Sequence, residues 1–89
     1  MIIRTASAGS LESSDCLVTV TPAEANETAH SGANGRLFAS RTARLVAETL
    51  KTYGVTNARI QIQDQGALEM TLRARIETAI ERAMERTAS

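Results

Sequence analysis

The strongest constraint on the fold is a change of hydrophobic period near residue 65. Between Ala58 and Gln63, apolar and polar residues alternate one by one, which predicts a half-buried strand. Asp64-Gln65-Gly66 is a turn signal, and we expect Asp64 to cap the element that follows. From Ala67 to about Arg86 the apolar spacing becomes helical. The apolar line of this predicted helix consists of Leu68, Leu72, Ile76, Ile80 and Met84.

The N-terminal third predicts a β-hairpin. In residues 16–21, Cys16, Val18 and Val20 alternate with Leu17 and two threonines, which predicts a strand with one buried face, and Pro22 is expected to end it. Residues 1–10 are weakly extended, with Ile2 and Ile3 as good strand formers. The stretch AGSLESSD lies between the two segments, so we expect residues 12–15 near the tip of the hairpin.

The middle of the chain predicts a loop followed by a helix. Residues 22–35 are polar, and His30 is interpreted as a loop histidine. From about Arg36 to Tyr53 the apolar residues form a helical stripe wide enough to pack on a sheet. Asn34 is a candidate N-cap, and Gly54 suits the left-handed position that ends a helix.

These elements together predict an α+β fold. We expect a small two-layer domain in which a β-hairpin and at least one further strand pack against two α-helices. With 89 residues, the chain is predicted to form one domain over residues 1–89. Charges of alternating sign at Glu69, Arg73 and Glu77 are interpreted as a solvated helix face.

Composition argues against several classes of partner. Lys plus Arg and Asp plus Glu number ten each, so the chain lacks the basic excess that nucleic acid requires. No apolar run approaches the ~18 residues of a membrane span, and the first residues do not resemble a secretory signal. A single cysteine rules out an internal disulfide and fits a reducing compartment, so we expect a cytoplasmic protein.

The side chains available for catalysis are few. The chain has one histidine, one cysteine, one tyrosine and no tryptophan, so neither a metal-binding cluster nor a catalytic triad is predicted. Cys16 falls on the apolar face of its strand, where cysteine usually acts as a small hydrophobe. We therefore expect a carrier, an adaptor or a subunit, with no catalytic residues and no metal.

Two separated motifs resemble one family. The stretch AGSLESSD, followed by an alternating strand, resembles the Gly-Thr-Leu-Glu-Ser-Gly/Ser-Asp signature of the citrate lyase acyl carrier protein, the gamma subunit. The helix end Tyr53-Gly54-Val55 and the tract DQGALE, running on into LRAR, are also similar to that family. The likeness covers nearly the whole chain in one order and with similar spacing.

The resemblance implies a function that composition does not show. It implies that Ser13 carries a covalent phosphoribosyl-dephospho-CoA group, with the adjacent Ser14 as the fallback position. The thiol of that group would hold acetyl or citryl thioesters. The implied partners are the alpha subunit (acyl transferase), the beta subunit (lyase), a prosthetic-group transferase and an acetylating ligase. The net reaction of the complex would convert citrate to acetate and oxaloacetate.

The chain departs from the family pattern in three places. Ser14 stands where many members have glycine, and Ser10 replaces the more usual threonine. Relatives often have a short alternating segment where this chain has NETAHSGAN, so a strand over residues 27–31 is expected by analogy alone.

The two acidic residues beside the serines, Glu12 and Asp15, can be interpreted in two ways. They are recognised by the transferase, directly or through a divalent metal, or, for Asp15, they serve ordinary turn chemistry by bonding backbone amides.

Three other functions stay open at this point. A carrier subunit of malonate decarboxylase, or of a related lyase, would use the same prosthetic group. Fatty-acid or polyketide carriers are acidic helical bundles with Asp-Ser-Leu at a helix start, whereas this chain has Asp15-Cys16-Leu17 leading a strand. The third alternative is a small adaptor domain without a covalent group.

Overall fold

The chain forms a four-stranded sheet and two helices. The computed structural model describes residues 1–32 and 35–85, so the predicted N-cap Asn34 and the predicted helix end at Arg86 lie outside the described residues. The elements are β1 (Ala6–Gly9), β2 (Cys16–Pro22), β3 (Glu27–Gly32), α1 (Gly35–Tyr53), β4 (Ala58–Asp64) and α2 (Glu69–Met84).

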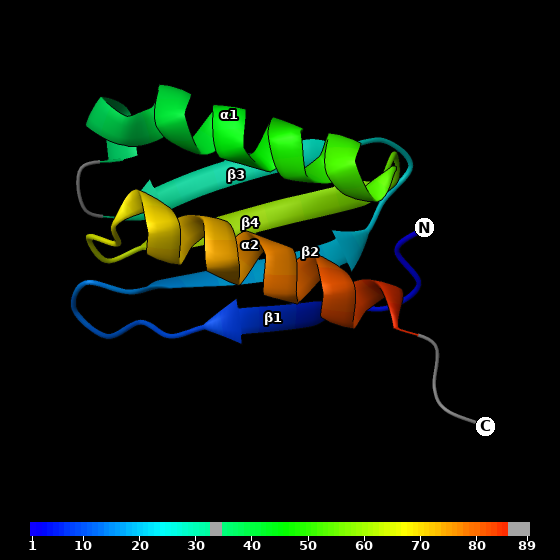
Figure 1. Cartoon of the computed structure of the whole chain (residues 1–89), viewed down its shortest axis with the longest axis horizontal. Coiled ribbons are helices and arrows are strands. Elements are labelled where there is room, and N and C mark those ends of the chain that lie inside the picture. The colour runs from blue at the N-terminus through cyan, green and yellow to red at the C-terminus, as the bar shows by residue number, and fades with distance from the viewer. Residues whose placement is uncertain (33–34, 86–89) are drawn as a thin grey trace.

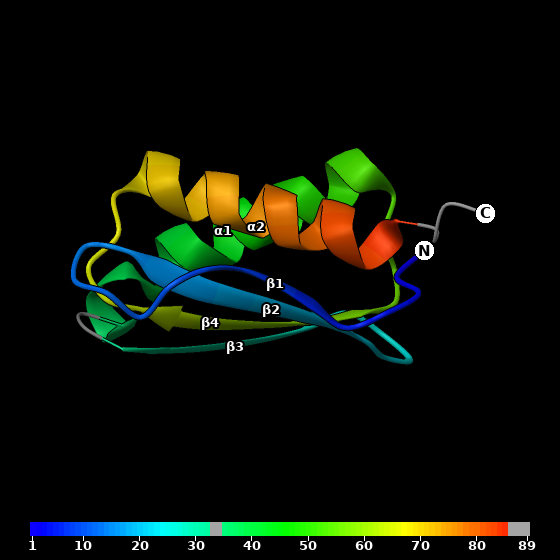
Figure 2. The same ribbon diagram turned by 90° about the horizontal axis from the view of Figure 1, so that it is seen from below.

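The sheet is mixed, with both helices on one of its faces. The strands run in the order β1-β2-β4-β3; β1 pairs with β2 and β2 with β4 in antiparallel fashion, whereas β3 and β4 are parallel. Figures 1 and 2 show α1 and α2 side by side over one face of the sheet, and the part of the chain that the structure describes has no helix on the opposite face. The prediction of an α+β, two-layer architecture built on a hairpin is therefore confirmed. A helical bundle, the fold of fatty-acid carriers, is excluded.

One predicted loop is wrong. Residues 27–32 form β3, the strand that the sequence itself did not indicate, and only the family analogy suggested it over residues 27–31. His30 is consequently a strand residue, paired with Ile62 and directed toward α1, rather than a loop histidine. The strand is polar because it lies at the edge of the sheet, where burial is slight and hydrophobic alternation is not required.

The core lies between the sheet and the two helices. Alternate residues of β2 and β4 face the helices, and α1 and α2 each contribute one apolar stripe. The predicted alternation in both strands is confirmed, and the open face of β2 and β4 is polar except for Leu17. Each fully buried aliphatic side chain stabilises the fold by roughly 1.5–3 kcal/mol. The largest are Leu45, Ile60, Ile62, Leu72, Ile76 and Ile80.

The helix ends follow the sequence in one case and depart from it in another. Gly54 has φ 65°, and the amides of Gly54 and Val55 bond to the carbonyls of Lys51 and Leu50, which confirms the predicted glycine stop of α1. The second helix begins two residues later than predicted, at Glu69. Leu68 therefore precedes the helix and is 74% exposed, so its placement on the buried stripe was wrong.

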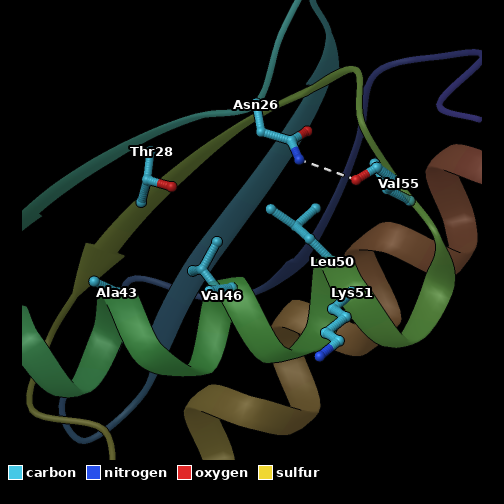
Figure 3. A pocket seen from close by; sticks show the side chains of 8 residues that line it. Asn26, Thr28, Ala43, Val46, Leu50, Lys51 and Val55 are labelled. Atoms are coloured by element: carbon cyan, nitrogen blue, oxygen red, sulfur yellow. Dashed lines mark hydrogen bonds between the residues drawn. The ribbon is translucent and has the colours of Figure 1, made fainter.

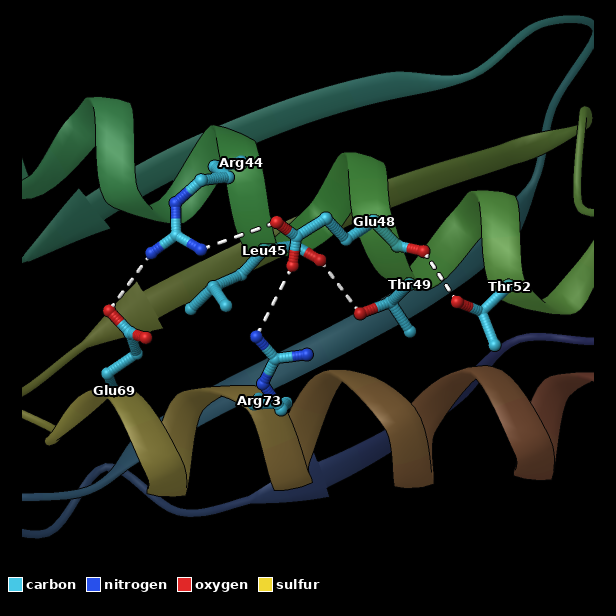
Figure 4. Close-up of polar contacts among 7 residues, drawn as sticks. All are labelled: Arg44, Leu45, Glu48, Thr49, Thr52, Glu69 and Arg73. Carbon is cyan, nitrogen blue, oxygen red and sulfur yellow. Dashed lines mark hydrogen bonds and ion pairs between the residues drawn. The ribbon is translucent and has the colours of Figure 1, made fainter.

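A group of ion pairs joins the two helices on their outer surface. Arg44 contacts Glu48 at 3.3 Å and Glu69 at 3.1 Å, and Arg73 contacts Glu48 at 3.3 Å (Figure 4). These side chains are about half exposed, in keeping with the predicted solvated face. Arg44 and Glu48 pair along α1, whereas Glu69 and Arg73 find their partners across the helices rather than along α2. Each pair contributes at most about 1 kcal/mol.

None of the helices described here combines the length and the apolar character that crossing a bilayer requires.

Candidate functional site

The loop that connects β1 and β2 is closed by backbone hydrogen bonds. At its neck the Ser10 amide donates to the Cys16 carbonyl at 3.1 Å. At its tip the Asp15 amide donates to the Glu12 carbonyl at 3.1 Å, which defines a four-residue turn with Ser13 and Ser14 at its centre. The prediction that residues 12–15 form the tip of the hairpin is confirmed.

The two central serines differ in backbone conformation. Both are exposed, and no hydrogen bond from the Ser13 hydroxyl to any described residue is found. Ser14 alone among the described non-glycine residues has a positive φ, of 66°. A left-handed residue at the third position of a turn is typical of type II, where glycine is favoured. A glycine at this position would adopt the same conformation without strain.

The tip of the loop is attached to the turn that follows β4. The Ser14 amide donates to the Gln65 carbonyl at 2.8 Å, and the Gln65 amide donates to the Asp15 carbonyl at 2.8 Å. Because Cys16 and Asp64 form the last pair of the β2–β4 ladder, these two bonds extend that ladder into the loop. The backbone beside Ser13 is therefore supported by a central strand.

Asp15 holds the loop together from within. Its carboxylate accepts hydrogen bonds from the Ser10 hydroxyl and the Cys16 amide, both at 2.7 Å. Arg75 of α2 adds a two-pronged contact, with its Nε and Nη2 each 3.1 Å from a carboxylate oxygen. The bond from Arg75, then those from Ser10 and Cys16, lower the pKa of Asp15 from 3.8 to about 2.

The contacts of Asp15 bear on its two sequence-based readings. Both carboxylate oxygens of Asp15 already accept hydrogen bonds, from Ser10, Cys16 and Arg75. The interpretation as turn chemistry therefore explains why an aspartate stands at this position. In the same contact, the Asp15 carboxylate raises the pKa of Arg75. Glu12 is exposed, and recognition of its carboxylate by a transferase stays a prediction.

Gly9 allows the two strands to approach at the neck of the loop. Its φ is 98°, and a Cβ atom there would lie 1.9 Å from the Cys16 carbonyl oxygen. No side chain fits at that distance, so the glycine of AGSLESSD is required by the closure of the hairpin.

A buried carboxylate organises the neighbouring turn. Asp64 is 1% exposed, and its Oδ1 accepts from the amides of Gly66 and Ala67 at 3.0 and 2.9 Å. Its Oδ2 lies 3.7 Å from both His30 Nε2 and Arg41 Nη2, and the Arg41 guanidinium offsets its charge. The predicted cap thus acts on the turn before α2 rather than on the helix, whose N-cap residue makes no side-chain capping bond.

Cys16 and His30 lie apart from the exposed hydroxyls. Cys16 is fully buried, and burial, followed by the nearby carboxylates, raises the pKa of its thiol to about 11. It therefore stays protonated at neutral pH and packs as the predicted small apolar residue. His30 lies on β3, which β4 separates from the hairpin. No group of three or more His, Cys, Asp or Glu suited to a metal ion occurs among the described residues.

Sequence reasoning did not find Arg75 or Gln65. Arg75 and Asp15 are 60 positions apart in the sequence, so their contact becomes visible only when the packing of α2 against the hairpin is known. Gln65 contacts the loop through backbone atoms alone, so its residue type gives no indication of this role. The tract DQGALE–LRAR contains both residues, so the family likeness was the one available hint.

The geometry describes a small domain that presents an exposed hydroxyl on a braced turn, the arrangement expected of a carrier domain. Residues 3–83 match the family model described as "Malonate decarboxylase delta subunit (MdcD)". Curated relatives are named "Citrate lyase acyl carrier protein". The protein from Treponema denticola is 40% identical over 96% of this chain and 98% of its own length. Those from Halothermothrix orenii and Streptococcus uberis are 39% and 42% identical over 92% of this chain and 88% and 82% of theirs.

The chain therefore belongs to the citrate lyase acyl carrier protein family. No solved structure gives a significant match to it.

Proposed function

We propose that this chain is the acyl carrier subunit of citrate lyase, with Ser13 as the attachment residue for phosphoribosyl-dephospho-CoA. The observation that carries the proposal is the exposed Ser13 hydroxyl at the centre of a turn braced by β4 and α2. A carrier serine must be accessible to a modifying enzyme and must start its tether from a fixed place. The turn meets both requirements.

The surroundings of Ser13 suit a bulky phosphodiester. Ser14 and Ser10 are small, and Ser13 itself is exposed, so space is available around the hydroxyl. Two carboxylates, those of Glu12 and Asp15, would repel the phosphate. The ion pair with Arg75 offsets the charge of Asp15, and water and salt screen the exposed Glu12. The chain thus tolerates the negative charge of the group.

The roles of the chain and of its partners are distinct in this proposal. When bound, the group supplies a thiol that carries acetyl or citryl as a thioester. The chain fixes the origin of the tether, and a tether raises the local concentration of its end at nearby active sites. The alpha subunit would exchange the acyl group, and the beta subunit would cleave the citryl thioester. A transferase attaches the group and a ligase acetylates it.

We further propose that residues 1–89 form one acyl carrier domain and that it acts in the cytoplasm. The argument for the compartment is the cysteine content, a single and buried thiol, which is typical of proteins in reducing surroundings.

Intact mass tests the attachment. Protein purified with its own transferase should be heavier by one prosthetic group, and Ser13→Ala should lack that increment. Ser14→Ala is the matched control, because it removes the adjacent exposed hydroxyl and should still be modified. If Ser13→Ala keeps the added mass, the assignment is wrong. Unmodified protein in every preparation from the native host would favour an adaptor domain instead.

A second candidate is the carrier subunit of malonate decarboxylase, which the description of the matching family model favours. The names of the curated relatives favour citrate lyase. Mass analysis of the acylated carrier separates the two: acetyl and citryl forms support citrate lyase, and a malonyl form supports the decarboxylase.

A further inference from the structure

The two halves of the hairpin loop are held by different kinds of contact. After Ser13, backbone hydrogen bonds extend the β2–β4 ladder into the loop. Before Ser13 and past the neck, side chains take over: the Glu12 amide donates to the Ser10 hydroxyl oxygen at 3.2 Å, and that hydroxyl donates to Asp15 at 2.7 Å. The N-terminal half of the loop, residues 10–12, is therefore held through the Asp15 carboxylate.

Arg75 fixes the orientation of that carboxylate. An aspartate carboxylate turns easily about its last side-chain bond, because this torsion has a broad energy profile. In the loop its two oxygens have different partners, since Oδ1 accepts from the Cys16 amide and Oδ2 from the Ser10 hydroxyl. The Arg75 guanidinium donates to both oxygens at 3.1 Å, and such a two-pronged contact holds the carboxylate in one plane. Each oxygen of Asp15 thus stays opposite its own partner.

Arg75 itself is anchored in the helix layer. It lies in α2 between Leu72 and Ile76, whose side chains are fully buried in the core, so the position of its backbone is fixed by packing. Its side chain passes over the neck of the loop, because a Cβ atom at residue 9 would lie 3.2 Å from Arg75 Cδ. The orientation of the loop is therefore coupled to the core through one side chain.

We propose that Arg75 is a positioning residue for the attachment of the prosthetic group to Ser13. Its contacts are with Asp15 rather than with the reacting hydroxyl, so it acts through Asp15 and Ser10 on the N-terminal half of the loop. The inference rests on the carrier function proposed above.

The attachment reaction is sensitive to such positioning. It joins the Ser13 oxygen to the α-phosphorus of a triphosphate donor and breaks the bond from that phosphorus to the departing pyrophosphate, while the hydroxyl proton passes to a base of the transferase. The attacking oxygen must be aligned with the breaking bond, and a displacement of about 1 Å costs on the order of 100-fold in rate. A loop that moves on the surface of the domain would present its hydroxyl in many orientations, most of them unproductive.

The rate at which purified transferase adds the group to Ser13, followed by intact mass, tests the proposal. Arg75→Gln should lower kcat/KM for the transfer at least about tenfold. Arg75→Lys should also stay well below the wild-type rate, because an ammonium keeps the charge but lacks the planar fork that grips both oxygens. Arg73→Gln is the matched control: Arg73 lies in the same helix and is 42% exposed against 40% for Arg75, but it pairs with Glu48 instead of the loop. This control should be modified at the wild-type rate.

A second pair of variants tests the link through Ser10. Ser10→Ala removes the hydroxyl that joins Asp15 to the Glu12 amide and should slow the transfer, whereas Ser10→Thr keeps a hydroxyl and should recover most of the rate. Amide hydrogen exchange gives a readout that does not involve the transferase. The Glu12 amide should exchange faster in Arg75→Gln and Ser10→Ala, but not in Arg73→Gln, while the amides of β4 stay protected in all of them.

Three results would overturn the proposal. Transfer to Arg75→Gln at the rate of Arg73→Gln is one, and full recovery of the rate in Arg75→Lys is another, because it would reduce the role of Arg75 to its charge. The third is a double variant, Arg75→Gln with Ser10→Ala, in which the two losses multiply. Residues that act as one unit are not additive, so independent losses would indicate direct contact between Arg75 and the transferase. A wild-type chain that is itself never modified would instead refute the carrier function.

Discussion

The glycine at the neck of the hairpin permits a controlled test of the structure. Gly9 and Gly66 have nearly the same φ, 98° and 92°. Alanine at either position carries the cost of a left-handed side chain, about 1–2 kcal/mol. The surroundings differ, because a Cβ at residue 66 meets nothing within 4 Å, whereas at residue 9 it would lie 1.9 Å from the Cys16 carbonyl oxygen. Ordinary contact begins at 3.4 Å, so the Gly9→Ala strand must move by more than 1 Å.

The expected difference in stability follows from that movement. Separating β1 from β2 at the neck removes the bond from the Ser10 amide to the Cys16 carbonyl, at a cost of about 1 kcal/mol. The displacement also strains the core beneath, which costs roughly 1–3 kcal/mol in overpacked sites. Gly9→Ala should therefore lower the free energy of unfolding by about 3–6 kcal/mol, against about 1–2 kcal/mol for Gly66→Ala.

Urea denaturation of the two variants and the wild type measures this difference, with comparable m-values as a check on two-state behaviour. A gap of about 2 kcal/mol corresponds to roughly 8–16 °C in melting temperature for a chain of this size. Equal destabilisation by the two substitutions, within about 0.5 kcal/mol, would refute the claim that close approach at the neck, rather than backbone conformation alone, requires Gly9.

Two further predictions concern the loop itself. Ser14→Gly should raise the free energy of unfolding by about 0.5–1 kcal/mol, because it removes left-handed strain worth more than the added entropy of the unfolded chain; a melting temperature that stays constant or falls would contradict this. Asp15 contributes stability when ionised, because its folded pKa of about 2 lies below the ordinary 3.8. Asp15→Asn should thus be less stable than the wild type at neutral pH. The gap should close as the pH falls from about 5 toward the folded pKa, as measured by denaturation across that range, and a constant gap would show that the ion pair with Arg75 is unimportant.

Local sequence predicted the elements whose residues face two environments. Strand residues 58–63 alternate because one side is buried and the other wet, and Gly54 ends α1 because only that backbone conformation closes the helix. Local sequence did not predict β3, because an edge strand needs little burial and therefore shows little alternation of apolar and polar residues. Leu68 was misassigned for a related reason: spacing alone continues a helical line past the residue where the helix begins.

The candidate site was predictable in part. The position of the turn followed from the strands on either side, and the proposal for Ser13 came from the family likeness rather than from physical chemistry. The support for the loop was not predictable, because Arg75 and the backbone of Gln65 reach it from distant parts of the chain. The hollow between α1 and β3, which Thr28, Ala43 and Ala47 help to line (Figure 3), was equally hidden, because it arises from small residues on a helix next to a strand that local sequence did not reveal.

The extension of the β2–β4 ladder into the hairpin loop limits how a cargo on Ser13 could travel. Because the peptide groups on the C-terminal side of Ser13 are locked to Gln65, the first free rotation is about the bonds of the serine side chain. Such a pivot sweeps the space ahead of the turn, and the body of the protein blocks the space behind it. If the cargo visited two active sites in succession, both sites would have to lie within the space in front of the turn. Otherwise the whole carrier would have to dissociate from the first enzyme and rebind in another orientation at the second.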